Sequence, residues 1–316
     1  MITRQIKYKF MKKPILFITF NKIEETKKVF KSIQQEKPQK LYISSDGPRQ
    51  THPDDLLKVI TIRNYILSNI DWPCKVRTLF FDKNLGCKYA VSSAISWFFL
   101  HEEMGIIIED DCLVENDFFL YCSTLLDKYA DDEKIYQING TCFLNQFNID
   151  ESYFFSKYSH IWGWATWRRA WQHYEINSFS FESDFLKINF YSEIEKQYWH
   201  HTLKQYYENK IDTWDYPWTF TILKNNGLCI YPKKNMVTNI GFGPNATHTK
   251  DINSPFSNMI IEKNEKIIHP KSIFINNQLD FAAFIAAYYK EKINYKQLLK
   301  QISLREIAKK YKYLKI

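Results

Sequence analysis

The sequence is poor in glycine, with only eight in 316 residues. No G-x-G-x-x-G follows the first apolar run, and the chain contains no G-x-x-x-x-G-K-[ST] loop. The dinucleotide fingerprint and the P-loop both depend on such glycines, so neither class of nucleotide enzyme is indicated. Long apolar runs are also missing, since none approaches the roughly 20 residues of a membrane-spanning helix. The basic N-terminus is not followed by the apolar core of a signal peptide, so we expect a cytoplasmic protein.

Cysteine is used without a recognisable pattern. None of the six residues forms a C-x-x-C pair, and no histidine cluster lies beside them. This spacing argues against a zinc site and against a disulfide scaffold. We therefore expect reduced, mostly packed thiols in a reducing compartment.

Basic charge is concentrated at the two ends of the chain. The net charge is +8, yet residues 1–13 carry five basic groups and no acid, and residues 304–316 carry five basic groups and one acid. The body between them is close to neutral, which argues against a groove for nucleic acid. Basic tails suit an anionic membrane surface, and solvated chain ends are the alternative.

Apolar and aromatic residues are abundant, at 45% and 17% of the chain. In the first 140 residues, continuous apolar runs alternate with amphipathic segments. This pattern predicts an α/β fold with a mostly parallel, Rossmann-like sheet and helices on both faces. The expected strands are 14–20, 41–44, 75–81, 105–108 and 135–138, and the expected helices are 23–35, 54–67, 90–100 and 116–129.

Four polar features follow these strands. They are Asn21-Lys22, Asp46, Asn84 and the acidic triplet 109–111. Ligands of open α/β sheets bind beyond the carboxyl ends of the strands. We therefore expect these side chains to face one crevice.

Glu109, Asp110 and Asp111 are consecutive acids at the end of a buried strand. Such a cluster is costly unless a cation neutralises it, and carboxylates with water suit Mg²⁺ or Mn²⁺. Alternation along the strand predicts Glu109 and Asp111 on one side and Asp110 on the other. The triplet can thus hold a metal and contact a sugar or ribose. A solvated acidic turn that caps the next helix is the alternative.

The second half is less regular and rich in tryptophan. Trp162, Trp167 and Trp171 are expected to be mostly structural, because tryptophan is usually largely buried. The composition of residues 239–249 predicts a polar loop. Helices are expected at 191–209, 279–290 and 297–312, the last of them basic and amphipathic.

The chain resembles the nucleotide-sugar glycosyltransferases with the GT-A fold. The stretch IIIEDDCLVENDFFLY is similar to the metal-binding segment of the N-acetylglucosaminyltransferase I family, where a strand ends in Glu-Asp-Asp before an acidic, Phe-rich helix. The chain also resembles bacterial nucleotide-diphospho-sugar transferases through ILFITFNK, LYISSDGPR, NLGCKYAVSSAISWFF, IWGWATWRRAW and NIGFGPNATHT. The resemblance covers about residues 14–250.

The resemblance implies nucleotide-binding residues in the first half. Lys22 stands where the family has an arginine near the nucleotide, and Asp46 matches an aspartate that hydrogen-bonds the uracil edge. A turn-capping role before Gly47 is the alternative for Asp46. Asn21 and Asn84, which follow the expected strands 14–20 and 75–81, are expected to bind the nucleotide as well.

The resemblance also implies roles for the acidic triplet and for the loop that contains His248. Asp111 matches the aspartate that contacts the metal, while Asp110 and Glu109 match residues around the ribose and the donor sugar. His248 lies in a loop similar to one that orders over the diphosphate, and we expect it to bind metal or phosphate. Lys250 nearby can pair with phosphate.

Two tryptophan motifs complete the implied site. Gly163-Trp164 resembles a pair that helps to wall the donor and acceptor sites. Trp214-Asp215 resembles a pair whose aspartate is the catalytic base. The family continues with a second acid where this chain has Tyr216, so Asp212 remains an alternative base.

The resemblance therefore implies an inverting, metal-dependent glycosyltransferase with Mn²⁺ or Mg²⁺. It would move a sugar from a nucleoside-diphosphate sugar, with UDP as the expected nucleotide, to a hydroxyl of a cell-surface glycan or lipid-linked acceptor. The basic tails suggest a place at the inner face of the membrane, and no nucleic-acid partner is expected. A sugar-nucleotide pyrophosphorylase or other metal-dependent phosphate-processing enzyme, and a non-catalytic sugar-binding scaffold, are the alternatives. The pyrophosphorylase is disfavoured because no glycine-rich loop follows the first strand.

The expected organisation is a single GT-A-type domain between basic ends. Residues 1–13 form the N-terminal tail, and the domain spans 14–275. Its nucleotide-binding half is 14–140 and its acceptor half is 141–275. Residues 276–316 form a basic helical extension.

Overall fold

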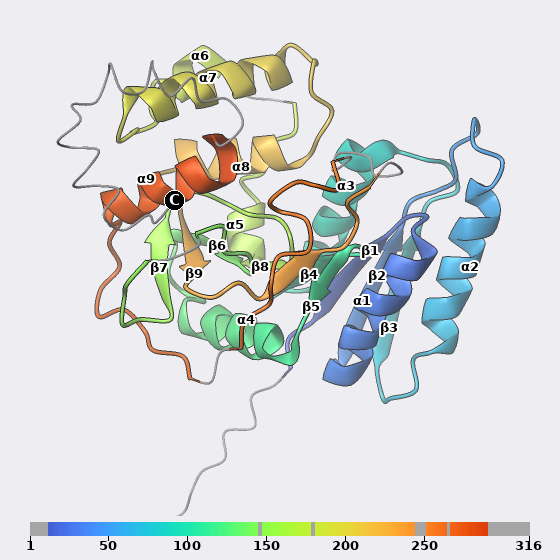
Figure 1. The fold of residues 1–316 in the computed structure, drawn as a ribbon. Coiled ribbons are helices and arrows are strands. Elements are labelled where there is room, and N and C mark those ends of the chain that lie inside the picture. Colours follow the sequence, from blue (N-terminus) through green and yellow to red (C-terminus); the bar gives the residue numbers. More distant parts are fainter. Residues whose placement is uncertain (1–11, 145–146, 178–180, 244–250, 264–265, 290–316) are drawn as a thin grey trace, which may run out of the picture.

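The computed structural model describes residues 12–144, 147–177, 181–243, 251–263 and 266–289. Ten strands lie in these ranges: β1 (Ile15–Thr19), β2 (Lys40–Ser45), β3 (Lys75–Phe80), β4 (Met104–Glu109), β5 (Cys112–Val114), β6 (Ile135–Asn139), β7 (Tyr153–Ser156), β8 (Trp164–Trp167), β9 (Leu228–Pro232) and β10 (Val237–Asn239). Eight of them form one sheet in the order β3-β2-β1-β4-β8-β6-β9-β7, and β10 pairs with β5 in a small second sheet (Figure 1).

The sheet is mostly parallel, as the sequence predicts. β3, β2, β1 and β4 are neighbours in parallel register, and β6 pairs in parallel with β9. β8 is the exception, because it lies antiparallel between β4 and β6. The edge strand β7 is antiparallel to β9. The five strands expected in the first 140 residues are all present, and the short β5 is an addition.

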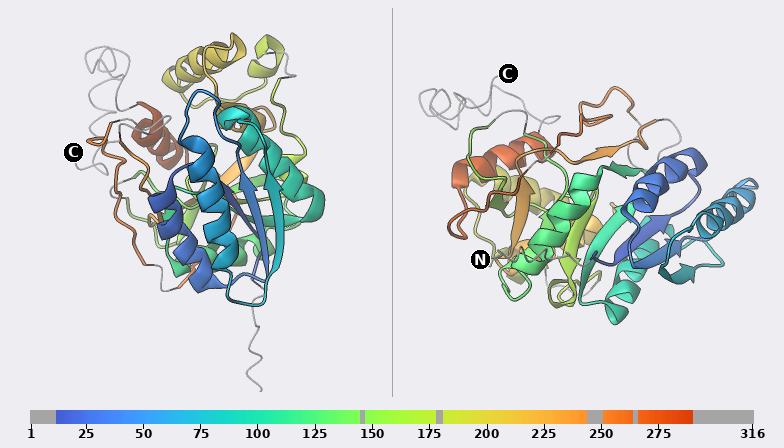
Figure 2. Two further views of the ribbon diagram at one scale, coloured as in Figure 1. Left: turned by 90° about the vertical axis from the view of Figure 1, so that its right-hand side faces the viewer. Right: turned by 90° about the horizontal axis from the view of Figure 1, so that it is seen from below.

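Helices cover both faces of the sheet, which confirms the α/β prediction (Figure 2). One face packs against α1 (Ile23–Glu36), α2 (Asp55–Ser68) and α4 (Asn116–Lys128). The other face packs against α3 (Gly86–His101), α5 (Arg168–Trp171) and α8 (Asp215–Lys224). The structure thus contains the four helices expected in the first half, and α3 begins four residues earlier than the apolar pattern suggests.

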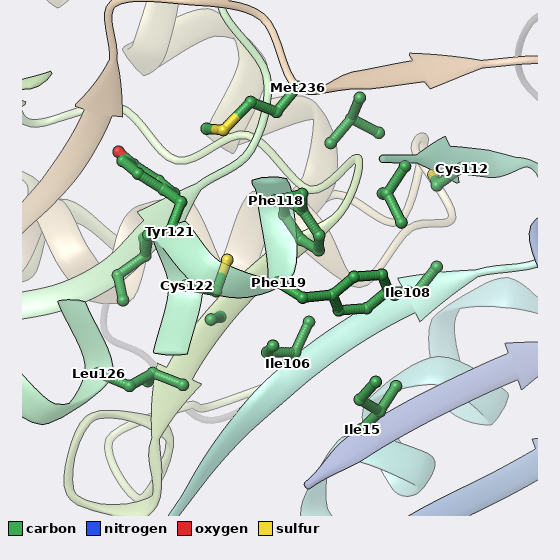
Figure 3. Packing of buried hydrophobic residues seen from close by; sticks show 14 of the residues in the cluster. Ile15, Ile106, Ile108, Cys112, Phe118, Phe119, Tyr121, Cys122, Leu126 and Met236 are labelled. Atoms are coloured by element: carbon green, nitrogen blue, oxygen red, sulfur yellow. The ribbon is translucent and has the colours of Figure 1, made fainter. Parts of the chain in front are cut away.

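The continuous apolar run of β1 follows from burial on both faces. Ile15 and Phe17 pack toward α1 and α4, whereas Leu16 and Ile18 pack toward α3. β4 behaves in the same way. Figure 3 shows Phe119 of α4 close to Ile106 and Ile108 of β4.

A third helical layer covers the second half. It contains α6 (Phe181–Phe185), α7 (Glu193–Tyr207) and α9 (Asn277–Phe284), which continues into a π-helical turn at Ile285–Tyr289. Ser192 and Glu195 form a capping box at the start of α7, so the helix predicted at 191–209 is confirmed with slightly narrower bounds. The helix expected at 297–312 lies outside the described residues.

The six cysteines are all free thiols, as expected. Within the described ranges, no helix combines the length and the apolar character needed to cross a membrane.

Candidate functional site

A cavity of about 450 Å³ lies at the carboxyl ends of β1, β2 and β4. Nine of the residues singled out from the sequence line it: Asn21, Lys22, Asp46, Asn84, Glu109, Asp110, Asp111, Trp214 and Asp215. The polar groups at the strand ends therefore do surround one crevice. What each of them binds stays a prediction.

The acidic triplet is held by two strong contacts. The Lys22 ammonium donates to Asp111 Oδ2 at 2.7 Å, and the Phe20 backbone N–H donates to Asp110 Oδ2 at 2.8 Å. All three acids line the cavity. β4 ends at Glu109 and the two aspartates lie in the following turn, so strand alternation does not govern the directions of their side chains.

Burial and mutual repulsion shift the protonation of these groups. Burial raises the pKa of Glu109 well above its ordinary value, and the carboxylates of Asp111 and Asp110 add to the shift. Burial and Asp111 also raise the pKa of Asp110 to about 7, against the hydrogen bond from Phe20. Burial alone would lower the pKa of Lys22, but the three carboxylates more than offset this and raise it. The site therefore favours positive charge.

The carboxylates can bind a metal ion only if a substrate supplies further ligands. Among the described residues, no group of three or more His, Cys, Asp or Glu side chains is placed to hold an ion. Asp111 nevertheless brings a carboxylate to the cavity, and Mg²⁺ or Mn²⁺ needs only one or two when phosphates and water complete its octahedron. The donor set therefore fits an ion shared with a phosphate ligand. His248, the second predicted metal ligand, lies outside the described residues, as does Lys250.

Gly241 lies directly on the Lys22–Asp111 pair. The backbone N–H of Ile240 donates to the carbonyl oxygen of Asp111 at 2.8 Å, which brings the segment after β10 over the acidic turn. A Cβ atom on Gly241 would lie 2.3 Å from Asp111 Oδ2 and 2.7 Å from Lys22 Nζ. Glycine is therefore required here for close approach of the backbone.

Asp46 joins the end of β2 to the start of α3. Its Oδ1 accepts the backbone N–H groups of Gly47 and Leu85, at 2.8 and 2.9 Å. Its Oδ2 accepts the Asn84 amide at 2.8 Å and the Gly86 N–H at 3.1 Å. Each oxygen of Asp46 already accepts two hydrogen bonds. Asp46 therefore has the turn-capping role that the sequence offered as the alternative. Recognition of a base by Asp46 stays a prediction that would need one of these bonds to open.

Arg49, which lines the cavity, and its buried partner Asp55 are residues that sequence reasoning missed. Arg49 Nε donates to Asp55 Oδ2 at 2.6 Å, and the Asn21 amide donates to Asp55 Oδ1 at 2.8 Å. The Arg49 guanidinium also lies 5.3 Å from the centre of the Phe20 ring. Arg49 and Asn21 both line the cavity, so this network fixes the side of the cavity that the first half of the chain forms. No spacing or motif in the sequence links the three residues.

We expect Asp55→Asn to destabilise the fold in a pH-dependent way. Burial would raise the pKa of Asp55, but the hydrogen bonds from Arg49 and Asn21 outweigh it and lower the pKa to about 2. The stabilisation is therefore present above about pH 4 and is lost as the pH falls from about 4 to about 2. Arg49 is 37% exposed, so solvent screens part of the pair, and we expect a loss of about 1 to 2 kcal/mol at pH 7.

Urea unfolding at pH 7 and pH 3.5 measures this difference. The neighbouring Asp54 is exposed, and Asp54→Asn is the matched control with little expected effect. Equal losses for both variants, or a loss that grows toward low pH, would contradict the assignment.

The other side of the cavity is formed by the second half of the chain. Asp215 is the first residue of α8, its Oδ1 accepts the Thr213 hydroxyl, and it lines the cavity. The alternative base, Asp212, is exposed and does not line it. The Asp215 carboxylate is close enough to Glu109 to contribute to the raised pKa of that group. Geometry therefore favours Asp215 over Asp212.

An aromatic wall of the cavity comes from the second half of the chain. Trp162, expected to be mostly structural, lines the cavity, whereas Trp167 and Trp171 are buried in the core. Phe143 packs edge-on against Trp162, with ring centres 5.5 Å apart. Tyr288, from the expected C-terminal extension, also lines the cavity, and its hydroxyl donates to the Ser159 carbonyl at 2.8 Å.

Gly163 and Trp164 do not line the cavity. Trp164 is fully buried and stacks on Trp214, with ring centres 5.7 Å apart. Gly163 has φ = 59°, and its carbonyl accepts the Gly140 N–H at 3.0 Å. The structure places both residues in the core, and any contact with sugar stays a prediction.

We expect Gly163→Ala to lower the free energy of unfolding by about 2 kcal/mol. An L-residue is strained at this φ, and the new Cβ would lie 2.8 Å from Val237. Denaturant unfolding measures the loss. Gly86→Ala is the control, because Gly86 also has a positive φ but no atom within 4 Å of the new Cβ. An equal loss for both would mean that crowding against Val237 contributes nothing.

Cys87 lies at the start of α3 and lines the cavity, but it is not suited to be a nucleophile. Burial raises the pKa of its thiol, and the carboxylates of Glu109 and Asp215 raise it further. The thiol therefore stays protonated at neutral pH, and nucleophilic attack by thiolate is disfavoured.

Comparison with protein-family models gives no match, and neither does comparison with curated proteins. Among solved structures, the chain is similar to the mannosyltransferase PcManGT from Pyrobaculum calidifontis in complex with GDP-Man and Mn²⁺. The identity is 9%, the match covers 68% of this chain and 69% of that chain, and the TM-score is 0.37.

Two further structures are similar to a comparable degree. HddC from Yersinia pseudotuberculosis shows 14% identity, coverage of 55% of this chain and 85% of that chain, and a TM-score of 0.34. The 4-diphosphocytidyl-2C-methyl-D-erythritol synthase from Anaerococcus prevotii shows 10% identity, coverage of 63% and 84%, and a TM-score of 0.31. Scores this low carry no argument about activity. They also lend no support to a specific likeness to the N-acetylglucosaminyltransferase I family.

Proposed function

We propose that the chain is a glycosyltransferase that moves a sugar from a nucleoside-diphosphate sugar to a hydroxyl group. The supporting observation is that one cavity brings together Lys22, Arg49 and the acidic triplet on one side and the Asp215 carboxylate on the other. A diphosphate can bind the two cationic side chains and share a divalent ion with the triplet, and a hydroxyl that must lose a proton needs the Asp215 carboxylate. The volume of about 450 Å³ is typical of small-ligand sites.

Asp215 is the general base of this proposal. The acceptor hydroxyl gives its proton to the Asp215 carboxylate while its oxygen attacks the anomeric carbon, and the bond from that carbon to the diphosphate breaks. Attack opposite the leaving group inverts the anomeric centre. The N-terminus of α8 favours a negative charge at Asp215 before the reaction.

Glu109 has a different role from Asp215. Burial and the neighbouring acids raise its pKa, and its carboxyl group lines the cavity, where it can form a hydrogen bond with a hydroxyl of the donor sugar. Asn21, Asn84 and Asp110 remain the proposed contacts of the nucleotide. UDP is the preferred nucleotide in this proposal.

Asp111 would hold the divalent ion, Mn²⁺ or Mg²⁺, together with the donor phosphates. When bound, the ion neutralises negative charge that builds on the leaving diphosphate. Lys22 lies beside Asp111 and adds a donor for the phosphates. His248 remains a proposed ligand of metal or phosphate.

The acceptor is proposed to be a cell-surface glycan or a lipid-linked sugar. Phe143 and Trp162 of the aromatic wall line the cavity, where their ring surfaces can pack against a sugar. The basic ends of the chain fit the inner face of an anionic membrane. Both ends lie outside the described residues, so this part of the proposal depends on the sequence.

Thermal unfolding with UDP, GDP, CDP or ADP, each with Mn²⁺ or with chelator, tests the proposal. A ligand at about 100 times its dissociation constant stabilises by about 2.7 kcal/mol, which is a shift of a few degrees. We expect the shift with one nucleotide and only with Mn²⁺. Release of that diphosphate from a panel of its sugars then identifies the donor. Pyrophosphate release from sugar 1-phosphate and nucleoside triphosphate would instead indicate a pyrophosphorylase, and no binding at all would indicate a scaffold.

A further inference from the structure

The Lys22–Asp111 ion pair places a cation on the one carboxylate proposed to bind the metal. Lys22 immediately precedes α1, and Asp111 lies two residues beyond the end of β4. Nζ and Oδ2 are 2.7 Å apart, and the two side chains are only 23% and 14% exposed. A charge-assisted bond of this length in a largely buried place is strong. In the absence of a ligand, Lys22 is therefore the ion-pair partner of Asp111.

The surroundings leave little room for a second cation on the same oxygen. The backbone at Gly241 packs so closely that a Cβ there would lie 2.3 Å from Asp111 Oδ2 and 2.7 Å from Lys22 Nζ. A divalent ion that used this oxygen would meet both that backbone and the ammonium. Like charges at such a distance repel strongly in a partly buried site. Lys22 and a metal ion therefore compete for Oδ2 of Asp111, and an ion on Oδ1, which accepts the Cys112 thiol at 3.5 Å, would still be repelled by the nearby ammonium.

A diphosphate changes this balance because it offers Lys22 another anion. The ammonium is a point charge on a flexible stem of four carbons, so it can turn from the carboxylate to phosphate oxygens within the same cavity. Asp111 is then available to the metal, which the phosphates also help to hold. This step rests on the proposed function, since it requires a donor with a diphosphate.

We propose that Lys22 makes metal binding at Asp111 conditional on a diphosphate ligand. Without the ligand, Lys22 holds Asp111 and the chain binds a divalent ion poorly. With the ligand, Lys22 binds phosphate and the ion binds Asp111. The apparent affinity for metal alone is lowered in proportion to the fraction of molecules with the ion pair closed.

Mn²⁺ binding to the full-length protein without nucleotide tests the first half of the proposal. The electron paramagnetic resonance signal of free Mn²⁺ measures it directly, with no need for catalysis. We expect Lys22→Gln to bind Mn²⁺ about tenfold more tightly than the wild type. This is the gain expected if the ion pair is closed in about nine of ten wild-type molecules, which leaves only about one in ten able to bind the ion. Lys22→Arg keeps the charge and should stay close to the wild type. Adding Asp111→Asn to Lys22→Gln should remove the gain.

Lys27→Gln is the matched control, because Lys27 lies on α1 in an exposed pair with Glu24. Far-ultraviolet circular dichroism is used to check that every variant is folded. Equal Mn²⁺ affinities for Lys22→Gln and the wild type would overturn the proposal. So would a gain that survives Asp111→Asn.

The second part of the proposal predicts that the same substitution weakens the binding of the nucleotide. For the nucleoside diphosphate that stabilises the wild type, calorimetry with saturating Mn²⁺ should show about tenfold weaker binding to Lys22→Gln, because the phosphates lose a cationic partner. Unchanged nucleotide affinity would overturn the conditional role of Lys22. If no nucleoside diphosphate binds but Lys22→Gln still gains Mn²⁺ affinity, the proposed function fails while the competition between Lys22 and the metal stands.

Discussion

Asp215→Asn is expected to abolish sugar transfer and to leave donor binding intact. Asparagine has nearly the same shape and still accepts a hydrogen bond from the Thr213 hydroxyl, but it cannot take a proton from the acceptor. Loss of a general base costs about 10²- to 10⁴-fold in turnover. Steady-state release of the nucleoside diphosphate measures turnover, and calorimetry measures donor affinity.

The chain supplies a matched control for this experiment. Asp212 lies three residues earlier and is exposed outside the cavity, so Asp212→Asn should turn over at close to the wild-type rate. The reverse result, with Asp212→Asn inactive and Asp215→Asn active, would transfer the role of base to Asp212. Near wild-type turnover of both variants would remove the proposed mechanism.

Asp111→Asn is expected to remove the Mn²⁺-dependent part of nucleotide binding. The neutral amide is a much poorer partner for a divalent ion than a carboxylate, so the ion would lose its carboxylate ligand and depend on the phosphates, water and His248. We expect at least about tenfold weaker binding of the nucleotide in Mn²⁺, equivalent to about 1.4 kcal/mol, and a thermal shift no larger than with chelator. Each variant is compared with its own unliganded form, because Asp111→Asn also breaks the ion pair with Lys22.

Glu115→Gln is the control for Asp111→Asn. Glu115 is an exposed acid four residues further on, at the start of α4, and it does not line the cavity. The variant should keep the full Mn²⁺-dependent shift. A shift that persists in Asp111→Asn would mean that the metal is held elsewhere.

The two sides of the described cavity come from different parts of the sequence. Strand ends and loops of the first 111 residues form the side with Lys22, Arg49 and the acidic triplet. The side with Asp215 comes from residues beyond 140 and includes Tyr288. Donor variants and acceptor variants should therefore have separable effects, the first on nucleotide affinity and the second on turnover.

The sequence by itself determined the elements of the first half, except for the short β5, and the edge of the sheet at which the cavity lies. β1 and β4 are continuous apolar runs because both of their faces are covered, and this pattern is visible without a structure. Chain direction then places Lys22, Asp46 and the acidic triplet beyond the carboxyl ends of parallel strands. Those positions follow from local periodicity and the rule for parallel sheets, so they could be predicted.

The partners of these residues were decided only by the tertiary structure. Lys22 and Asp111 are 89 residues apart, and they meet because β1 and β4 are neighbours in the sheet. The bonds of Asp46 to the start of α3 depend on how the β3–α3 turn returns to β2, which hydrophobic periodicity does not specify.

The same holds for the far wall of the cavity. Trp162 and Tyr288 line it because β8 lies antiparallel between β4 and β6 and because the segment after α9 returns to Ser159. Burial of a tryptophan or tyrosine can be predicted from its type, but the surface against which it packs cannot. That surface depends on contacts between segments distant in the chain, and only the folded structure brings them together.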